Sequence, residues 1–359
     1  MEKLLIRDAQ VVNDGRVIRA DVLMHGDRIE RVAAEGIGSS NGAKELDARG
    51  RHLLPGAIDD QVHFREPGLT HKEDIAHGSA AAAAGGITSY MEMPNTVPQT
   101  LTQALLEEKY TLARASSVVN YSFYMGCGER NIEEVVRTDS RTVCGLKAFL
   151  GSSTGDMVIT DERALDELFR RAHMLLAVHA EDDPTIRREL EGRIARYGDD
   201  IPIEDHPLIR SAEACYASSS AAVARAKEFG TRLHVLHIST ARELDLFEPG
   251  PLEGKRITAE ACVHHLWFTD ADYASKGNLI KWNPAVKTAA DRDAIRKAVN
   301  DGRIDVVATD HAPHTLDEKA MKYRQCPSGG PLVQHAMPAM LEMARDGVFS
   351  VPEVVEKMC

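Results

Sequence analysis

Residues 53–63 of the chain read LLPGAIDDQVH. We interpret residues 53–59 as a buried strand, and polar residues gather where this apolar segment ends, at Asp59, Asp60, Gln61 and His63. A strand of a parallel sheet is covered on both faces and is therefore expected to be apolar along its length. The polar cluster at its carboxyl end needs a reason other than packing, and the same arrangement recurs along the chain.

The recurrence predicts the fold. Segments rich in Ala, Glu and Arg alternate with apolar segments, and they are predicted as helices at 79–84, 101–115, 161–172, 211–229 and 289–300. The predicted strands are 53–59, 87–93, 119–125, 143–150, 174–179, 232–238, 256–261 and 304–309. Eight strands alternating with helices predict an α/β fold, a (β/α)8 TIM-like barrel. A doubly wound sheet is the alternative, but no Gly-rich phosphate-binding fingerprint follows the first strand.

The first fifty residues have a different pattern. Short apolar runs are separated by turn signals such as Asn13-Asp14-Gly15, and this is typical of antiparallel strands. We expect residues 1–50 to be the N-terminal part of a small β-sandwich domain, although a surface hairpin would fit equally well. Residues 51–359 are expected to form the catalytic barrel. Residues 354–359 read as the middle of a helix, so we expect the C-terminal end to be truncated.

Composition limits the partners and the compartment. Lys and Arg number 43 against 55 Asp and Glu, which gives a formal net charge of −12. This balance argues against nucleic acid or an anionic membrane as the main partner. The N-terminus lacks the apolar core of a signal peptide, and no apolar run reaches the ~18 residues of a membrane helix. The 6 cysteines are scattered, so we expect a reduced, cytoplasmic protein.

Ionisable residues occupy several predicted strand ends. In a (β/α)8 barrel these ends converge on one mouth, where such enzymes place their active sites. A single buried histidine is usually a satisfied core residue, but several at corresponding positions are not easily explained that way. A nitrogen-rich set with one carboxylate suits zinc, and its members are His63, His179, His237 and Asp310.

Lys147 is the unusual member of this group. Burial near divalent metals favours its neutral amine, which can add carbon dioxide and form a carbamate able to bridge two metals. The alternative is a lysine that pairs with an acid at the barrel mouth.

Seven motifs carry a family resemblance. They are DDQVHFREPG at 59–68, MPNT at 93–96, GLK at 145–147, HAED at 179–182, LHVLHIST at 233–240, TAEACVHHL at 258–266 and TDHAPH at 309–314. Together they resemble the amidohydrolase superfamily and, within it, the class I-like dihydroorotase family, over the whole chain. The FREPG run combined with MPNT is similar to dihydroorotase rather than to allantoinase or hydantoinase, which share the metal-site pattern.

The resemblance implies an activity. The reaction is the reversible cyclisation of N-carbamoyl-L-aspartate to (S)-dihydroorotate plus water, by a metal-bound hydroxide, in pyrimidine (UMP) biosynthesis. It implies one or two zinc ions per chain, a carbamylated Lys147 and a small-molecule substrate. We also expect a homo-oligomer.

The resemblance also implies roles for individual residues. Metal ligands would be His63, Lys147, His179, His237 and Asp310, with Gln61 a doubtful one. Asp310 would also be the catalytic proton shuttle. Arg65, Asn95 and His314 would hold the substrate carboxylate, Asn283 would touch the ring, and Gly329 and Gly330 would contact the substrate through a loop backbone.

Gln61 departs from the family pattern, because the first strand normally ends His-x-His. An amide oxygen is a poorer zinc ligand than imidazole, so one metal position should be weaker or empty. Two alternatives stay open: a non-catalytic dihydroorotase-like partner of another pyrimidine enzyme, and a related cyclic-amide hydrolase such as allantoinase. Retention of the other site residues favours an active enzyme. We expect His264 and His265 to be structural, because they lie beyond a strand end already occupied by Glu260.

Overall fold

The structure is a computed structural model that describes residues 2–38, 42–151 and 157–359. Contacts divide the chain into two compact units. One comprises Met1–Ala57 and Met340–Cys359, and the other comprises Ile58–Ala339. The predicted domain ranges also include residues 1, 39–41 and 152–156, which lie outside the described residues, and the predicted boundary at residue 50 stays a prediction.

The first unit is built on a small sheet. Its strands are β1 (Lys3–Asn13), β2 (Arg16–His25), β3 (Arg28–Ala33), β4 (Lys44–Asp47) and β5 (His52–Leu53). Strands β1, β2 and β3 are antiparallel neighbours, while β4 and β5 pair with β1 in parallel. Asp14 and Gly15 both have positive φ, as a tight hairpin turn requires. The predicted antiparallel hairpins are therefore present. Helix α13 (Val351–Met358) packs on β1 within this unit.

The second unit is the predicted barrel. Its strands are β6 (Ala57–Val62), β7 (Ile87–Glu92), β8 (Asn120–Gly126), β9 (Gly145–Phe149), β10 (Leu176–His179), β11 (Leu233–Val235), β12 (Ile257–Cys262) and β13 (Val306–Ala308). Each strand neighbours the next in chain order. The last and first strands are joined by a parallel bridge between Val62 and His311, where the His63 amide donates to the His311 carbonyl at 2.7 Å. The (β/α)8 prediction is confirmed.

The predicted range of the first barrel strand, 53–59, begins and ends too early. Residues 53–59 do not form one strand, since β5 ends at Leu53 and β6 begins only at Ala57. Pro55 between them has no amide hydrogen to donate to a ladder. As a result Asp59, Asp60 and Gln61 lie inside β6 rather than beyond its end. The other seven predicted strands each overlap an observed one.

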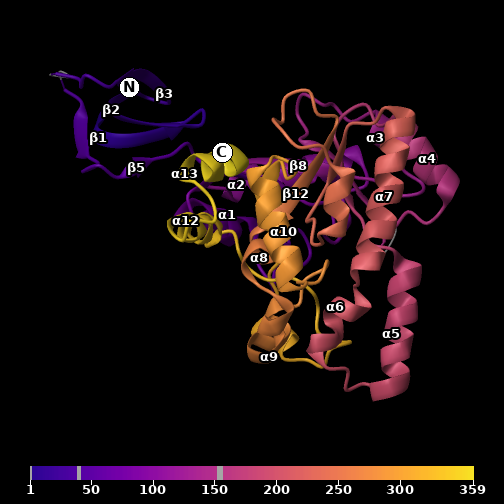
Figure 1. The fold of residues 1–359 in the computed structure, drawn as a ribbon. Coiled ribbons are helices and arrows are strands. Elements are labelled where there is room, and N and C mark those ends of the chain that lie inside the picture. The colour runs from indigo at the N-terminus through magenta and orange to yellow at the C-terminus, as the bar shows by residue number, and fades with distance from the viewer. Residues whose placement is uncertain (1, 39–41, 152–156) are drawn as a thin grey trace. The chain divides into compact units, whose positions relative to one another are not determined.

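Helices cover the outside of the barrel, as α7 and α10 show in Figure 1. The longer ones are α1 (Ile75–Ala84), α2 (Gln103–Ser116), α4 (Glu162–Arg171), α5 (Asp183–Tyr197), α7 (Ala212–Phe229), α10 (Ala289–Asn300) and α12 (Ala336–Arg345). The short helices are α3 (Ile132–Val136), α6 (His206–Ile209), α8 (Val263–Trp267), α9 (Tyr273–Lys276) and α11 (Leu316–Lys319). All five predicted helices are present. Their beginnings are set by side-chain caps, for example Thr288, whose hydroxyl accepts from the Asp291 amide.

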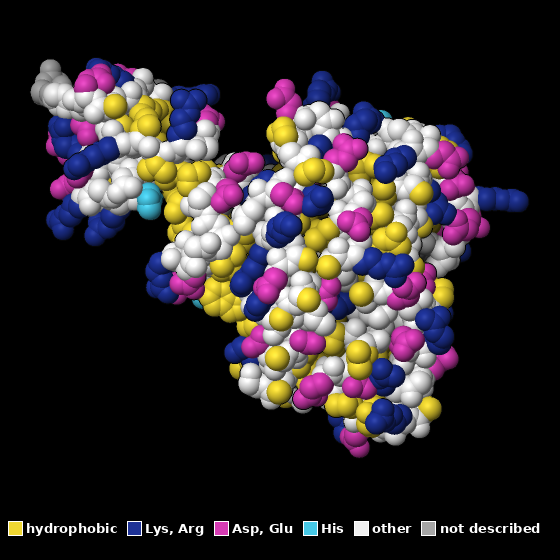
Figure 2. Space-filling view, viewed as in Figure 1, with side chains coloured by type: hydrophobic (Ala, Val, Ile, Leu, Met, Phe, Trp, Pro, Cys, Tyr) yellow, Lys and Arg dark blue, Asp and Glu magenta, His cyan; other side chains and the backbone are white. Residues whose placement is uncertain are grey.

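The surface and the helices agree with the composition. Lys, Arg, Asp and Glu side chains are intermixed on the face of the barrel unit shown in Figure 2. Within the described ranges, every helix is too short or too polar to cross a bilayer.

Asp59 fastens the two ends of the barrel sheet together. Its Oδ2 accepts from the Thr309 hydroxyl at 2.5 Å, and its Oδ1 accepts from the backbone amides of Thr309 and Gln61, each at 3.2 Å. The Thr309 hydroxyl oxygen also accepts from the His311 amide at 3.0 Å. Burial raises the pKa of Asp59 to about 8. These bonds hold β6 beside the segment that carries Asp310.

We expect Thr309→Val to destabilise the barrel. Valine matches threonine in shape but leaves the Asp59 carboxyl and the His311 amide without their shared partner, which costs about 1–3 kcal/mol. Chemical denaturation followed by circular dichroism should show an earlier midpoint, whereas Thr309→Ser, which keeps the hydroxyl, should unfold close to wild type. An unchanged midpoint in the valine variant would show that this contact does not stabilise the closure.

Candidate active site

A pocket of about 110 Å³ lies at the mouth of the barrel. It is lined by Gln61, His63, Arg65, Asn95, Phe149, His179, His237, Asn283, Asp310, Ala312, Ser328 and Gly329. Most of the predicted site residues are therefore brought together. Lys147, His314 and Gly330 are not among the lining residues. Phe149, Ala312 and Ser328 were not predicted.

His179 and His237 face each other at the ends of β10 and β11. Nδ1 of His179 lies 2.9 Å from Nε2 of His237. Both rings are buried, and burial lowers both pKa values below the ordinary histidine range. The imidazoles are therefore neutral, the form that ligates metals. His237 Nδ1 has no hydrogen-bond partner among the described residues.

Glu181 orients the first of these histidines. Its Oε2 lies 3.0 Å from His179 Nε2, and the same oxygen pairs with Arg210. Burial alone would raise the pKa of Glu181, but the Arg210 guanidinium and His179 hold it below its ordinary value. A hydrogen bond from the outer ring nitrogen to a carboxylate is the usual support of a metal-ligating histidine. Sequence reasoning assigned Glu181 no role, although its place two residues after His179 was a signal.

Lys147 lies on β9 and has 1% of its surface exposed. Its Nζ has no hydrogen-bond partner within the described ranges and lies 4.4 Å from the centroid of the Phe149 ring. Burial lowers its pKa to about 7, despite the attraction of Asp310 and Glu260. Among the described residues, no acid contacts Lys147 Nζ. The alternative interpretation, a lysine paired with an acid, is therefore not supported.

Asp310 is the shared partner of Gln61 and His63. Its Oδ1 accepts from Gln61 Nε2 at 3.1 Å and lies 3.1 Å from His63 Nε2. The other ring nitrogen of His63 is 2.8 Å from Asn95 Oδ1. Gln61 Oε1, the atom able to ligate a metal, is directed to Cys262 Sγ at 3.8 Å.

Among the described residues of the barrel unit, the non-glycine residues with positive φ all lie at this site. Arg65, His237 and Asp310 have φ values of 66°, 41° and 47°. The left-handed region costs a non-glycine residue about 1–3 kcal/mol. The strain is borne by three residues whose side chains all line the pocket, as is common at functional sites.

Arg65 brings a positive charge to the pocket, and a second cation, Lys72, contacts the same histidine as Arg65. Arg65 donates from Nε to the Pro313 carbonyl at 3.1 Å, and its Nη2 lies 3.1 Å from His314 Nε2. Lys72 Nζ lies 3.0 Å from the other ring nitrogen of His314. Burial, together with these two cations, lowers the pKa of His314 to about 3, so the ring is neutral. Sequence reasoning missed Lys72, although it follows the FREPG motif by only a few residues.

Two buried lysines secure the loop that carries Gly329. Lys319 Nζ donates to the carbonyls of Pro327 and Gly329, at 3.1 and 2.9 Å. Lys281 Nζ donates to the Tyr323 and Cys326 carbonyls, and its own carbonyl accepts from the Gly329 amide at 2.8 Å. Burial lowers the pKa of each lysine to about 8. Sequence reasoning gave neither lysine a role.

Only glycine fits at position 329. Its φ is +129°, and a Cβ there would lie 2.4 Å from the Ala312 carbonyl oxygen. Its amide donates to the Lys281 carbonyl and its carbonyl accepts from Lys319 Nζ. Gly330 instead packs on Trp282, and its carbonyl accepts from the Ala312 amide at 3.0 Å.

Comparison with known proteins places this arrangement in a family. The model of the family described as dihydro-orotase-like matches residues 50–243. The dihydroorotase of Halobacterium salinarum is 37% identical over 355 residues, which is 98% of this chain and 79% of that protein. This chain belongs to the dihydroorotase-like family. The resemblance stated from the motifs is confirmed.

Other relatives carry other names. The dihydroorotase of Methanosarcina mazei is 32% identical and covers 99% of this chain and 78% of its own length. The allantoinase of Solibacter usitatus is 33% identical over 87% of this chain and 68% of that protein. Among solved structures, the L-hydantoinase of Arthrobacter aurescens superimposes with a TM-score of 0.94 at 25% identity, covering 100% of this chain and 81% of the other.

We expect Lys319→Met to loosen the Gly329 loop. Methionine fills similar volume but cannot donate to the two loop carbonyls, so the loop amides should open more often. Hydrogen exchange measured by mass spectrometry should accelerate across residues 326–330. Lys227→Met, at an exposed position on α7, serves as the matched control, and equal exchange in both variants would contradict the assignment.

Proposed function

We propose that this protein is a dihydroorotase that interconverts N-carbamoyl-L-aspartate and (S)-dihydroorotate. One observation carries the choice of substrate: the Arg65 guanidinium lines the same pocket as His179, His237 and Asp310. A second cation, Lys72, contacts the neutral His314 ring that Arg65 also contacts. Dihydroorotate is a cyclic amide with a carboxylate, whereas allantoin and hydantoin have no carboxylate. A bidentate arginine contact is the preferred recognition of such a group.

The donor set fits a metal. His237 Nδ1 and Lys147 Nζ are buried without partners among the described residues, and the facing nitrogens of His179 and His237 belong to neutral rings. These are ligands that zinc favours. We propose that His179, His237 and Lys147 hold one ion and that His63 and Asp310 hold a second, less tightly because Gln61 replaces an imidazole. The bound metal would supply Lewis acidity and a water molecule of lowered pKa.

Lys147 is proposed to act as its carbamate. The neutral amine nitrogen bonds to the carbon of carbon dioxide and releases one proton, which leaves an anionic group with two oxygens. The neutral amine is the reactive form, and burial supplies it near neutral pH. The pocket thereby gains a carboxylate-like ligand.

The remaining side chains bind the substrate and move its proton. In hydrolysis the cyclic C–N bond breaks, and Asp310 delivers a proton from Oδ1 to the departing nitrogen; in cyclisation it removes that proton. Arg65 grips the carboxylate, with Asn95 and His314 beside it. Asn283 Oδ1 is buried without a partner in the described part of the chain and can accept from the ring amide.

Two other functions compete with this proposal. The allantoinase relative favours a different cyclic amide, and Gln61 favours a non-catalytic partner of another pyrimidine enzyme. Assays of the zinc-loaded protein with dihydroorotate, allantoin and hydantoin separate all three. We expect turnover of dihydroorotate alone; turnover of allantoin alone, or of none, would overturn the proposal. Zinc as the resident metal, a cytoplasmic location and a homo-oligomer stay predictions.

Lys147→Ala should lose both tight metal binding and turnover. The alanine variant lacks the bridging anion, and a short carboxylic acid such as propionate should restore part of the activity by taking its place. Metal content and initial rates with and without added acid provide the measurement. Near-normal turnover in this variant would remove Lys147 from the site.

Arg65→Lys should raise the KM for dihydroorotate about tenfold while changing kcat less. Lysine keeps a positive charge but loses the planar pair of hydrogen bonds, a difference of about 1.4 kcal/mol. Steady-state kinetics measures the split between the two constants. Arg163→Lys, at an exposed position of α4, is the control, and an unchanged KM for Arg65→Lys would mean that Arg65 serves the structure only.

Gln61→His should strengthen the second metal position. Imidazole is a better zinc ligand than an amide oxygen, and Gln61 Oε1 is directed to Cys262 rather than to Asp310. Under mild chelation, the wild type should release one metal early, and the histidine variant should retain it longer. Two metals lost together and equally slowly from both proteins would contradict a weakened position.

A further inference from the structure

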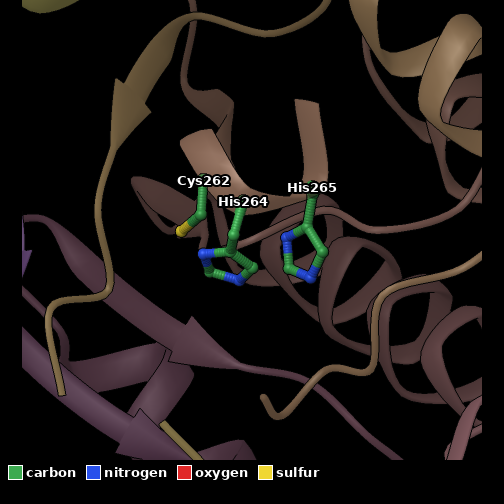
Figure 3. Close-up of side chains that lie close together, drawn as sticks. All are labelled: Cys262, His264 and His265. Carbon is green, nitrogen blue, oxygen red and sulfur yellow. The ribbon is translucent and has the colours of Figure 1, made fainter. Parts of the chain in front are cut away.

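Three ligand-type side chains meet where β12 ends and α8 begins. Cys262 is the last residue of β12, and His264 and His265 lie in α8. One ligand atom of each lies within 4.8 Å of the other two. Figure 3 shows the Cys262 sulfur beside the His264 ring, with the His265 ring next to it. None of the three lines the pocket described above.

The histidine nitrogens are buried with unused lone pairs. His265 Nε2 contacts the Pro284 carbonyl at 3.1 Å, which fixes the proton on that nitrogen and leaves Nδ1 without a partner among the described residues. His264 stacks on Trp282, with ring centroids 4.3 Å apart and an angle of 10° between the ring planes. The Thr309 backbone lies near the His264 ring, but neither ring nitrogen has a hydrogen bond of good geometry among the described residues. Both side chains are at most 3% exposed. Burying an unsatisfied polar atom costs about 1–3 kcal/mol. A ligand that bonds to the free nitrogens of His264 and His265 would therefore stabilise the folded protein.

A metal ion would satisfy both rings and the sulfur. Thiolate sulfur and imidazole nitrogen are ligand types that zinc favours. We propose that Cys262, His264 and His265 form a further binding site, outside the active-site pocket, for zinc or a similar soft divalent ion. Binding transfers the Cys262 thiol proton to solvent, and the Sγ–metal bond replaces the present contact of Sγ with Glu260 Oε1 at 3.3 Å. Gln61 Oε1, 3.8 Å from Sγ, is placed to be the fourth donor.

This cluster differs from another group of similar composition. Asp60, His234 and Glu260 also lie close together, but there His234 Nε2 is 3.3 Å from Asp60 Oδ2 and 3.8 Å from Glu260 Oε2. A protonated histidine between two carboxylates balances much of its own charge. Cys262, His264 and His265 include no opposite charges that could do so.

The proposed site changes the interpretation of Gln61. Gln61 Nε2 donates to Asp310, while Gln61 Oε1 is directed to the cluster. An ion held by Cys262 would therefore fix the side chain that stands where the family has a histidine. His264 and His265 then have a ligand role rather than the structural role expected from the sequence.

Cobalt(II) chloride is a suitable probe, because a thiolate ligand gives cobalt a charge-transfer absorption in the near ultraviolet. We expect this band in the wild type and in Lys147→Ala, whose active-site metal would be lost, and we expect it to disappear in Cys262→Ser. Cys215→Ser, at an equally buried cysteine outside the cluster, should keep the band. Persistence of the band in Lys147→Ala separates this site from the proposed function.

Absence of the band in wild type, or its survival in Cys262→Ser, would overturn the proposal. X-ray absorption of the zinc-loaded wild type gives a test that needs no variant to fold. We expect a sulfur neighbour of zinc at about 2.3 Å. A coordination shell with only nitrogen and oxygen would equally overturn it.

Discussion

The candidate site depends on the closure of the barrel between β6 and β13. Gln61 and His63 are separated from Asp310 by 249 and 247 positions in sequence, and only the joining of the first strand to the last brings them within hydrogen-bond distance. The Asp59–Thr309 bonds and the Val62–His311 bridge make that join. The positions of Gln61 and His63 relative to Asp310 follow from this long-range contact.

Burial then sets the chemistry of the side chains at the mouth. Burial destabilises the charged forms of Lys147, His179 and His237. Each side chain is therefore neutral, which is the form that binds a metal or reacts with carbon dioxide. The surroundings of His314 differ, because they include the two cations Arg65 and Lys72. Arg65 donates to the Pro313 carbonyl and Lys72 pairs with Glu318, and burial together with these two cations keeps the His314 ring neutral. The pocket thus combines neutral nitrogen donors with an arginine.

Much of this could be predicted from the sequence. Strand ends that carry His, Lys and Asp in an alternating α/β pattern predict both the barrel and the composition of its mouth. The first strand was displaced because an apolar run that contains Pro55 and Gly56 spans two strands, and apolar character alone does not show where pairing stops. Lys281 and Lys319 were missed because a buried lysine that binds backbone carbonyls has no periodic signal. The direction of the Gln61 amide depends on Cys262 and Asp310, which are distant in sequence.

The proposed carbamate requires that burial makes Lys147 a neutral amine able to take up carbon dioxide near neutral pH. Carbon-13 NMR of the zinc-loaded protein with labelled carbon dioxide, held at a fixed dissolved concentration across a pH series, tests it most directly. Because burial lowers the pKa of Lys147, the reactive neutral amine becomes more abundant as the pH rises, so the carbamate resonance should grow with pH and be absent from Lys147→Ala. A wild-type protein with no carbamate resonance at any pH, or with one that survives in Lys147→Ala, would contradict the account.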